Sequence, residues 1–459
     1  MKISLKSYLR RSFVLLCTGV LAVSLFSSCK EESQTNYNPD ADGTSKDFKT
    51  FETVEATDYS LTFYWGPDED KFAENDIKLM KEAGFDTVPI QRFPENHAKI
   101  KDVVNLLEKE GLKAAVCDDR ITKLYEASEI PSQEAVDTAV QEVLDYYKDY
   151  SNITEWIVCD EPSADKFDVI ARIADAIHRL SPEDKVFVNL FPSYASASAL
   201  GTATYREYLE TFCEKVKPDY ISFDYYDLIG ADITEYHRGG FLKNLADVTS
   251  VAKKYNKETR VIVLLTKHGD YSNVTQAEIN WQSNLSILFG MKSLSFFTYA
   301  LPEDPSFVWE FAMLDADGKT TDHYNAVKTA NTTTRVYGDA IYNTKVDKVF
   351  SINNEYTSEF INNIDTYTSY GDLGEVKEGI DMLVSFYENG TFMIMNGNSD
   401  EGNPRKLVTK DLTENLQWLN PFTRRWETIH SCFFIEQNAD GAYEITLIEG
   451  NAVLLRVGK

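Results

Sequence analysis

Residues 155–162 read EWIVCDEP, a run of apolar residues that ends in two acids and a proline. A short apolar run of this kind is typical of a strand that is buried on both faces of a parallel sheet. After Pro162, apolar residues recur at helical spacing, at Phe167, Ile170, Ile173, Ala174 and Ile177. The region therefore predicts a strand followed by an amphipathic helix.

The same strand and helix unit recurs from about Thr57 to Asn343. Eight such units in roughly 285 residues match the size of a (β/α)8 TIM barrel. A doubly wound open sheet is the main rival, but no Gly-rich phosphate loop follows the first strand. The predicted strands are Ser60–Tyr64, Thr87–Ile90, Lys113–Cys117, Glu155–Cys159, Val186–Leu190, Tyr220–Asp224, Val261–Leu265 and Ser293–Tyr299.

The helical period disappears beyond about residue 344. Short stretches of alternating polarity replace it, and turn pairs such as Asn389-Gly390 and Asp440-Gly441 separate them, as expected for hairpins. We predict a barrel domain over residues 51–343 and a small antiparallel β-sandwich over residues 344–459.

The first 28 residues have a basic start, an apolar run from Phe13 to Phe26 and small residues directly before Cys29. This pattern predicts a lipoprotein signal peptide that is removed, with Cys29 as the lipid anchor. Residues 29–50 are polar and predict a flexible tether. The alternative is an ordinary signal peptide that happens to contain a cysteine. We expect an exported protein, lipid-anchored to the outer membrane and facing the periplasm or the cell surface.

The formal net charge is -27, and removal of the leader with its four basic residues would make it -31. Such a surface repels nucleic acid and anionic lipid headgroups, so a nucleic-acid partner is not expected. A neutral substrate would not be strongly affected by this charge.

Cysteine and histidine usage gives no metal pattern. The cysteines after Cys29 are widely spaced, and the six histidines show no HxH or HExxH spacing, so we expect neither a metal nor a cofactor. The cysteines are Cys117, Cys159, Cys213 and Cys432. We interpret them as buried thiols, with a disulfide between Cys117 and Cys159 as the alternative.

The active site of a TIM barrel lies at the carboxyl ends of its strands. Asp160 and Glu161 follow the fourth strand, and Asp224 ends the sixth. Glycoside cleavage needs one protonated carboxylic acid and one ionised carboxylate, so we predict Glu161 as the acid and Asp224 as the second carboxylate. The structural alternatives are a helix cap for Glu161 and a buried, hydrogen-bonded carboxylate for Asp224.

Further polar and aromatic residues follow the other strands, and we predict that they bind substrate. Aromatic faces can stack on the apolar side of a sugar ring. Tyr299 and Trp309 could instead pack the barrel, and His268 could simply be solvated. The predicted binding residues are Asp118, Asp160, Asn189, Tyr226, His268, Tyr299 and Trp309.

Several stretches resemble the TIM-barrel glycoside hydrolases related to clan A and the family 42 β-galactosidases, and the chain is most similar to uncharacterised lipoproteins of Bacteroidota. The resemblance covers nearly the whole barrel, and a terminal β-sandwich is also usual in such enzymes. Its motifs are CDEP (159–162), VNLFPSY (188–194), KPDYISFDYY (217–226), the run from Lys267-His268 to Phe297-Thr298-Tyr299, and DGKT (317–320).

The resemblance places Glu161 where clan A enzymes keep the acid/base glutamate, although the preceding residue is Asp160 rather than the usual Asn. Clan A enzymes also carry a nucleophilic glutamate at the seventh strand, where this chain has Thr266-Lys267-His268. Three accounts remain: Asp224 is the second carboxylate, Glu303 or Asp304 is, or hydrolysis has been lost.

Two functions are therefore carried forward. The first is a glycoside hydrolase that acts on a polysaccharide or glycan outside the cytoplasm, with a carbohydrate substrate and other glycan-uptake proteins as partners. The second is a non-catalytic glycan-binding lipoprotein of the cell surface, built on a degenerate glycosidase barrel.

Overall fold

The computed structural model describes residues 52–226, 228, 235–352, 364–400, 402–410, 412 and 415–458, without the side chains of residues 235–238. The predicted leader, the Cys29 anchor and the predicted tether lie outside the described residues. Within the described part, no helix is both long and apolar enough to cross a membrane.

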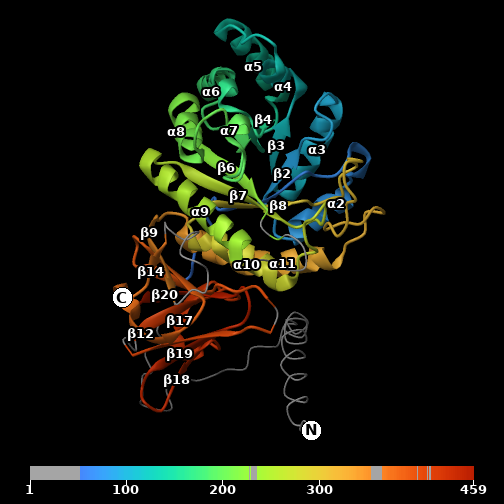
Figure 1. Cartoon of the computed structure of the whole chain (residues 1–459). Helices are drawn as coiled ribbons and strands as arrows, with labels where there is room; N and C mark the ends of the chain where they lie inside the picture. Colours follow the sequence, from blue (N-terminus) through green and yellow to red (C-terminus); the bar gives the residue numbers. More distant parts are fainter. Residues whose placement is uncertain are drawn as a thin grey trace, which may run out of the picture. The chain divides into compact units, whose positions relative to one another are not determined.

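Eight parallel strands form the first sheet, in the order β1-β8-β7-β6-β5-β4-β3-β2 (Figure 1). The backbone N–H of Asp86, just before β2, donates to the carbonyl of Leu61 in β1 at 3.0 Å, so the two ends of the sheet approach each other. The (β/α)8 prediction is confirmed. The strands are β1 Ser60–Tyr64, β2 Thr87–Ile90, β3 Lys113–Cys117, β4 Ile153–Asp160, β5 Lys185–Leu190, β6 Tyr220–Tyr225, β7 Glu258–Leu264 and β8 Ser293–Phe297.

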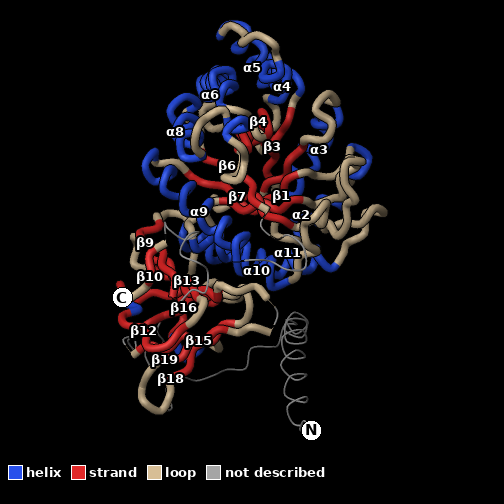
Figure 2. The backbone as a smooth tube through the Cα atoms, in the orientation of Figure 1, coloured by secondary structure: helices blue, strands red, loops and turns tan. Residues whose placement is uncertain are grey.

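Helices surround these strands (Figure 2). The predicted apolar face of the helix after β4 is buried in the core, together with the outward-facing side chains of the strands. The helices are α2 Glu74–Glu82, α3 His97–Glu110, α4 Asp119–Glu126, α5 Gln133–Tyr147, α6 Phe167–Leu180, α7 Ala197–Leu200, α8 Tyr205–Val216, α9 Glu235–Tyr255, α10 Gln276–Leu288 and α11 Asp322–Ile341.

Strand periodicity divides the side chains of the barrel into two sets. In β6, Ile221 and Phe223 face the helices, whereas Tyr220 packs in a small cluster inside the barrel. Asp224 is an even number of residues from Tyr220, so it belongs to the same inner face at the carboxyl end. Alternate residues of each strand thus face the interior of the barrel, and those at the carboxyl ends of the strands lie at its mouth.

The chain after α11 forms two further sheets with strand orders β10-β9-β13-β14-β20-β16-β17 and β11-β12-β15-β19-β18. All described pairings in them are antiparallel except β9 with β10. Their shared core includes Val384, Trp418 and Ile445. The strands are β9 Val346–Ile352, β10 Asp365–Thr366, β11 Ser369–Tyr370, β12 Gly374–Gly379, β13 Met382–Tyr387, β14 Thr391–Asn396, β15 Arg405–Thr409, β16 Leu416–Asn420, β17 Arg425–Thr428, β18 Ile435–Gln437, β19 Tyr443–Leu447 and β20 Ala452–Val457.

Helix α10 is buried on nearly all sides because it lies between the barrel and these sheets. The indole N–H of Trp281 donates to the Gly397 carbonyl at 2.9 Å, and the Asn284 amide donates to the Gly450 carbonyl at 2.8 Å. The hydroxyl of Tyr387 in β13 donates to the Ile287 carbonyl at 2.7 Å. Polar side chains on a buried helix face are thus satisfied by backbone groups across the interface.

The four cysteines of the described region are free thiols. Cys117, Cys213 and Cys432 are buried, as predicted, whereas Cys159 is only half-buried. The disulfide between Cys117 and Cys159, which the sequence left as an alternative, is not formed in this structure.

Candidate active site

Three carboxyl groups meet at the carboxyl ends of β4 and β6, with Asn189 of β5 between them. The strand register places Asp160 opposite Asn189, and Asn189 opposite Ser222. The Asn189 side-chain N–H groups donate to Asp160 Oδ1 at 3.0 Å and to Asp224 Oδ1 at 2.9 Å. The Ser222 hydroxyl donates to Asn189 Oδ1 at 3.2 Å and so fixes the amide orientation.

Glu161 stands just past the end of β4 with a φ of 44°, a left-handed conformation that is uncommon for a residue with a side chain. Its backbone N–H donates to the Asn189 carbonyl at 2.8 Å. Local strain of this kind persists where the surrounding structure enforces it, and it is concentrated at functional sites. The N-cap positions of the following helical turns are Ser163 and Lys166, so Glu161 is not a helix cap.

All three carboxyl groups have raised pKa values. Burial, and then the neighbouring Asp160, raise the pKa of Glu161 to about 7. Burial, followed by the charges of Glu161 and Asp160, raises the pKa of Asp224 well above its ordinary value. Burial also raises the pKa of Asp160, although hydrogen bonds from Asn189 and Tyr64 oppose this effect. Each of the three groups therefore resists ionisation more than an isolated carboxyl group does, and they titrate as a coupled set.

Aromatic side chains from the loops after β6, β7 and β8 line the mouth beside these carboxyl groups. Trp309 stacks on His268 with ring centroids 4.6 Å apart and an interplanar angle of 23°. Tyr226 stacks on Phe297 at 5.4 Å and 27°. These predicted binding residues therefore lie close together, as a wall that can exclude water and support a sugar ring.

His268 is buried. The alternative that this side chain is simply solvated is therefore wrong. Its Nδ1 lies 2.8 Å from the Thr266 carbonyl, which can only accept, so Nδ1 carries the hydrogen. Burial lowers the pKa of His268, so the ring is neutral near pH 7 and Nε2 is an acceptor. This nitrogen can accept a hydrogen bond from a hydroxyl group of a ligand.

Two of the predicted binding residues do not reach the mouth. Tyr299 is fully buried and stacks on Phe63 at 4.6 Å, so it is a packing residue. The Asp118 carboxylate is also fully buried, and Arg120 holds it through two bonds of 2.8 and 2.7 Å. Tyr147 and the backbone N–H of Arg120 also donate to Asp118, at 3.1 and 3.0 Å, so its four acceptor directions are taken and none remains for a sugar. Both predictions are corrected.

The alternative second carboxylates lie on an exposed loop. Glu303 is 3.9 Å from Lys71, and Asp304 Oδ1 accepts the backbone N–H of Ser306 at 2.8 Å. At the end of β7, Thr266 is buried against Thr298, and Lys267 pairs with Glu310 at 2.8 Å. Of the candidates for the second carboxylate, Asp224 is therefore the one whose charge interacts with that of Glu161.

Tyr64, the last residue of β1, also belongs to the site, although it is not among the residues predicted from the sequence. Its hydroxyl donates to Asp160, and Asp160 and Asp224 add to the effect of burial in raising the pKa of Tyr64. The next residue, Trp65, packs on the interior cluster and its indole N–H has no partner within the described part of the chain. Alternation along β1 would have pointed to Tyr64, because Leu61 and Phe63 face the helices.

Within the described residues, His97, Asp118 and Asp119 are the group whose ligand atoms lie close enough to share a metal ion. Arg120 already binds the Asp118 carboxylate, and Lys123 binds that of Asp119. His97 Nε2 lies 2.7 Å from Asp119. We therefore assign these side chains to an ion-pair network.

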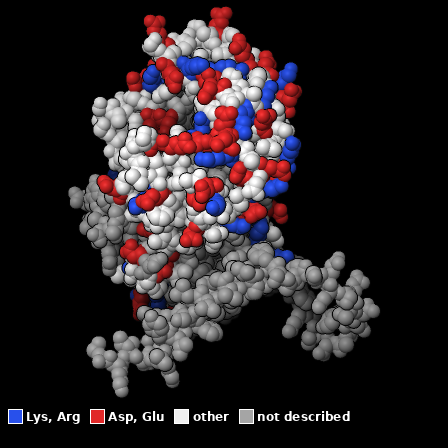
Figure 3. Space-filling model, turned by 90° about the vertical axis from the view of Figure 1, so that its right-hand side faces the viewer, with Lys and Arg blue, Asp and Glu red and all other residues white. Residues whose placement is uncertain are grey.

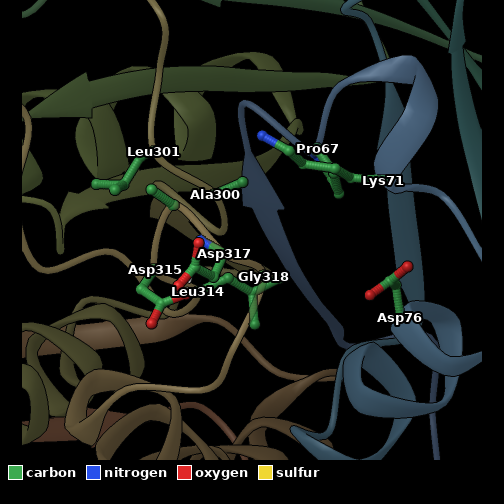
Figure 4. Close-up of a pocket in the computed structure, with 10 residues that line it drawn as sticks. Pro67, Lys71, Asp76, Ala300, Leu301, Leu314, Asp315, Asp317 and Gly318 are labelled. Carbon is green, nitrogen blue, oxygen red and sulfur yellow. Dashed lines mark hydrogen bonds between the residues drawn. The ribbon is translucent and has the colours of Figure 1, made fainter.

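A cavity of about 240 Å³ lies between the loop after β1 and the segment after β8 (Figure 4). Its acidic residues have structural partners. Asp76 accepts the Ala73 N–H at 2.9 Å, and Asp315 accepts the N–H groups of Asp317 and Lys319 at 2.9 Å each. The carboxyl cluster of β4 and β6 is not part of its lining, so this cavity is distinct from the mouth.

The face at the right of Figure 1 is shown in Figure 3, where acidic side chains lie inside and around a hollow in the upper part. A charge of -27 over the whole chain agrees with this excess of acids. Cations and neutral molecules approach such a hollow more readily than anions do.

No family model matches the sequence, and a comparison with curated proteins finds no match. Among solved structures, a glycoside hydrolase superposes with a TM-score of 0.52 at 11% identity, over 87% of this chain and 93% of that one. A glycoside hydrolase of family 5 from Bacteroides vulgatus ATCC 8482 gives a TM-score of 0.52 at 11% identity, over 87% and 89%.

A β-galactosidase from Halorubrum lacusprofundi gives a TM-score of 0.45 at 11% identity over 60% of this chain, which spans 58% of the length of that enzyme. At such identities the likeness shows the fold alone. The structural neighbours are glycoside hydrolases with TIM-barrel folds, whereas the relation to family 42 and to Bacteroidota lipoproteins stays a prediction.

Proposed function

We propose that this protein is a glycoside hydrolase that acts on a polysaccharide or glycan outside the cytoplasm. The observation that carries the proposal is the coupled set of Glu161 and Asp224 at the barrel mouth, in which the pKa of Glu161 is raised to about 7. Glycosidic cleavage uses a pair of carboxyl groups, one of which stays protonated near neutral pH because its pKa is raised.

In the proposed mechanism Glu161 donates its proton to the oxygen of the leaving group as the glycosidic bond breaks. Asp224 acts in its ionised form, as the base for a water molecule or as the nucleophile. The hydrogen bond from Asn189 favours that ionised form, and positive charge that develops on the sugar stabilises it further. His268 and Tyr226 would position the ring, Trp309 would contact the glycan beside that ring, and Asp160 would bind a hydroxyl group.

The direct test is an assay of reducing-end release over a broad panel of glycans. Turnover that disappears in a Glu161 or Asp224 variant supports hydrolysis. Release that continues in both variants would show that other residues perform the reaction.

Replacement of Asp224 by Asn should abolish turnover and yet stabilise the fold at alkaline pH. In the folded protein the pKa of Asp224 lies well above its ordinary value, so the free energy of unfolding falls as the pH rises above about 4. Asn cannot ionise, so we expect the unfolding temperature of Asp224→Asn to exceed that of the wild type by about 2–6 °C at pH 8. The difference should vanish toward pH 4.

The matched control is Asp149→Asn, which changes an exposed carboxylate just after α5. Its unfolding temperature should follow that of the wild type at every pH. A variant Asp224→Asn that is less stable than the wild type at pH 8 would show that Asp224 is ionised and paired in the fold.

A second candidate function is glycan binding without cleavage. It is favoured by the end of β7, where Thr266, Lys267 and His268 supply no carboxylate, and by the raised pKa of Asp224, which opposes its ionisation. This function predicts that a glycan binds at the mouth and that the wild type releases no reducing ends from it.

The proposed location rests on the leader and on Cys29, and the proposed partners there are other glycan-uptake proteins. Mass spectrometry of the N-terminal peptide of the mature protein tests it, because a lipoprotein should begin at Cys29 with a diacylglyceryl thioether on its sulfur. Cys29→Ser should leave the protein unacylated. An unmodified mature N-terminus elsewhere in the chain would contradict the anchor.

A further inference from the structure

The loop after β8 exposes apolar side chains beside the mouth. Phe307 is 48% exposed and Val308 is 76% exposed, while the adjacent Trp309 is half-buried. We call Phe307, Val308 and Trp309 the β8 ridge. A contiguous apolar surface on an acidic protein is costly to hydrate and commonly marks a site of interaction.

The β8 ridge is held in place by bonds on both of its sides. The backbone N–H of Lys267 donates to the Glu310 carbonyl at 3.0 Å, and that of Glu310 donates to the Lys267 carbonyl at 3.0 Å. The Trp309 indole N–H donates to the Asp304 carbonyl at 2.8 Å. A surface that is already ordered loses little entropy when a ligand binds to it.

Ring contacts connect the β8 ridge to the carboxyl cluster. Phe307 meets Trp309 edge to face at 5.6 Å and 82°, and it meets His268 at 5.7 Å and 75°. His268 in turn meets Phe297 at 5.5 Å, and Phe297 stacks on Tyr226. Tyr226 lies two residues after Asp224, so one aromatic surface leads from the acid groups to the solvent.

We propose that the β8 ridge binds sugar units of the same glycan that lie outside the unit held at Glu161, so that the ligand is an oligosaccharide or polysaccharide. This inference rests on the proposed function. The C–H faces of successive sugar rings match a row of exposed aromatic and aliphatic side chains.

The charges around the ridge favour a neutral glycan. Glu303, Asp304 and Asp270 are exposed on the neighbouring loops, and the cations Lys71 and Lys267 are paired with Glu303 and Glu310. Carboxylates in these positions repel uronic acids and anionic lipid headgroups. A neutral chain of sugars meets no such penalty.

The test is affinity electrophoresis in gels that contain galactomannan, xyloglucan, arabinoxylan, pectic galactan or dextran. The experiment is performed on Glu161→Gln, so that cleavage does not remove the ligand. We expect at least one of these polysaccharides to retard the protein, and we expect Phe307→Ser/Val308→Ser to weaken that retardation about tenfold. The matched control Phe422→Ser changes an equally apolar surface residue, 74% exposed and located in the sandwich, and should bind as before.

Failure of the inference and failure of the proposed function give different results. If the double variant is retarded as strongly as its parent, or if none of the five polysaccharides retards the parent, the assignment of the β8 ridge is wrong. Loss of binding to vesicles of phosphatidylethanolamine and phosphatidylglycerol in the double variant would assign the ridge to lipid and also overturn it. Retardation that depends on the ridge, with no release of reducing ends by the wild type, supports the ridge and contradicts hydrolysis.

Discussion

Replacement of Glu161 by Gln should lower kcat on an unactivated glycan by on the order of 10²–10⁴, because the variant cannot protonate the leaving oxygen. Gln keeps the size of the side chain, so folding and glycan binding should persist. In the wild type, the rate should fall as the pH rises through about 7, where Glu161 loses its proton. Initial rates of reducing-end release from pH 4 to pH 9 measure both effects.

An aryl glycoside with a dinitrophenolate leaving group provides an internal control, since that group departs without protonation. Turnover of this aryl glycoside should decrease much less in Glu161→Gln than turnover of the glycan. The pH–rate profile of the variant on this substrate should no longer fall above pH 7. Glu142→Gln, on the exposed surface of α5, is the matched control and should behave as the wild type. Wild-type kcat on the glycan in Glu161→Gln would refute the assignment of Glu161 as the acid.

Replacement of Arg260 by Met should destabilise the fold by about 3–5 kcal/mol. Arg260 of β7 donates to both oxygens of Glu155 in β4, at 2.9 and 2.7 Å, and both side chains are buried inside the barrel. Burial raises the pKa of Glu155, but the charge and hydrogen bonds of Arg260, together with Lys185 and Tyr220, outweigh burial and hold the pKa below its ordinary value. Without Arg260 a buried carboxylate remains unpaired. Urea unfolding followed by circular dichroism measures the loss.

The companion variant Glu155→Leu/Arg260→Met removes both charges. It should recover at least half of the lost stability, because apolar residues of similar volume can replace a buried ion pair. Tyr220 donates to Glu155 at 3.0 Å and loses this acceptor, which limits the recovery. A single variant Arg260→Met within about 1 kcal/mol of the wild type would show that water or another cation reaches Glu155.

The barrel could be predicted from the sequence because each strand is short, apolar and bounded by turn residues. The predicted and observed strands agree closely, and β4 runs from Ile153 to Asp160, slightly beyond both predicted ends. Asp160 is the last residue of this strand because it is still paired with Asn189 of the neighbouring strand β5. Polarity alone had suggested that the strand ended at Cys159.

The carboxyl cluster was predictable for a geometric reason. Carboxyl ends of parallel strands lie together, so Asp160, Asn189 and Asp224 had to be neighbours once the strands were assigned. The expectation that residues after a strand lie at the mouth fails where the chain turns away from the barrel axis. Tyr299 lies two residues past β8, and its side chain enters the layer between strands and helices.

The partners of His268 could not be read from the sequence. Its burial arises because the loop after β8 folds back and pairs with Lys267, more than forty residues earlier in the chain. Contacts of this kind depend on loop conformations for which neither periodicity nor turn residues give a signal.

The position of α10 makes the barrel and the sheets that follow it depend on each other. The helix packs against both the barrel and the sandwich. The side chains of Trp281 and Asn284 donate hydrogen bonds to the carbonyl groups of Gly397 and Gly450 in the sandwich. Gly450 is also confined, because a Cβ there would lie 2.2 Å from the Ala277 carbonyl oxygen. Separation of the chain at the junction between α11 and β9 would leave these polar groups without their partners, so the barrel and the sheets after it depend on each other for their structure.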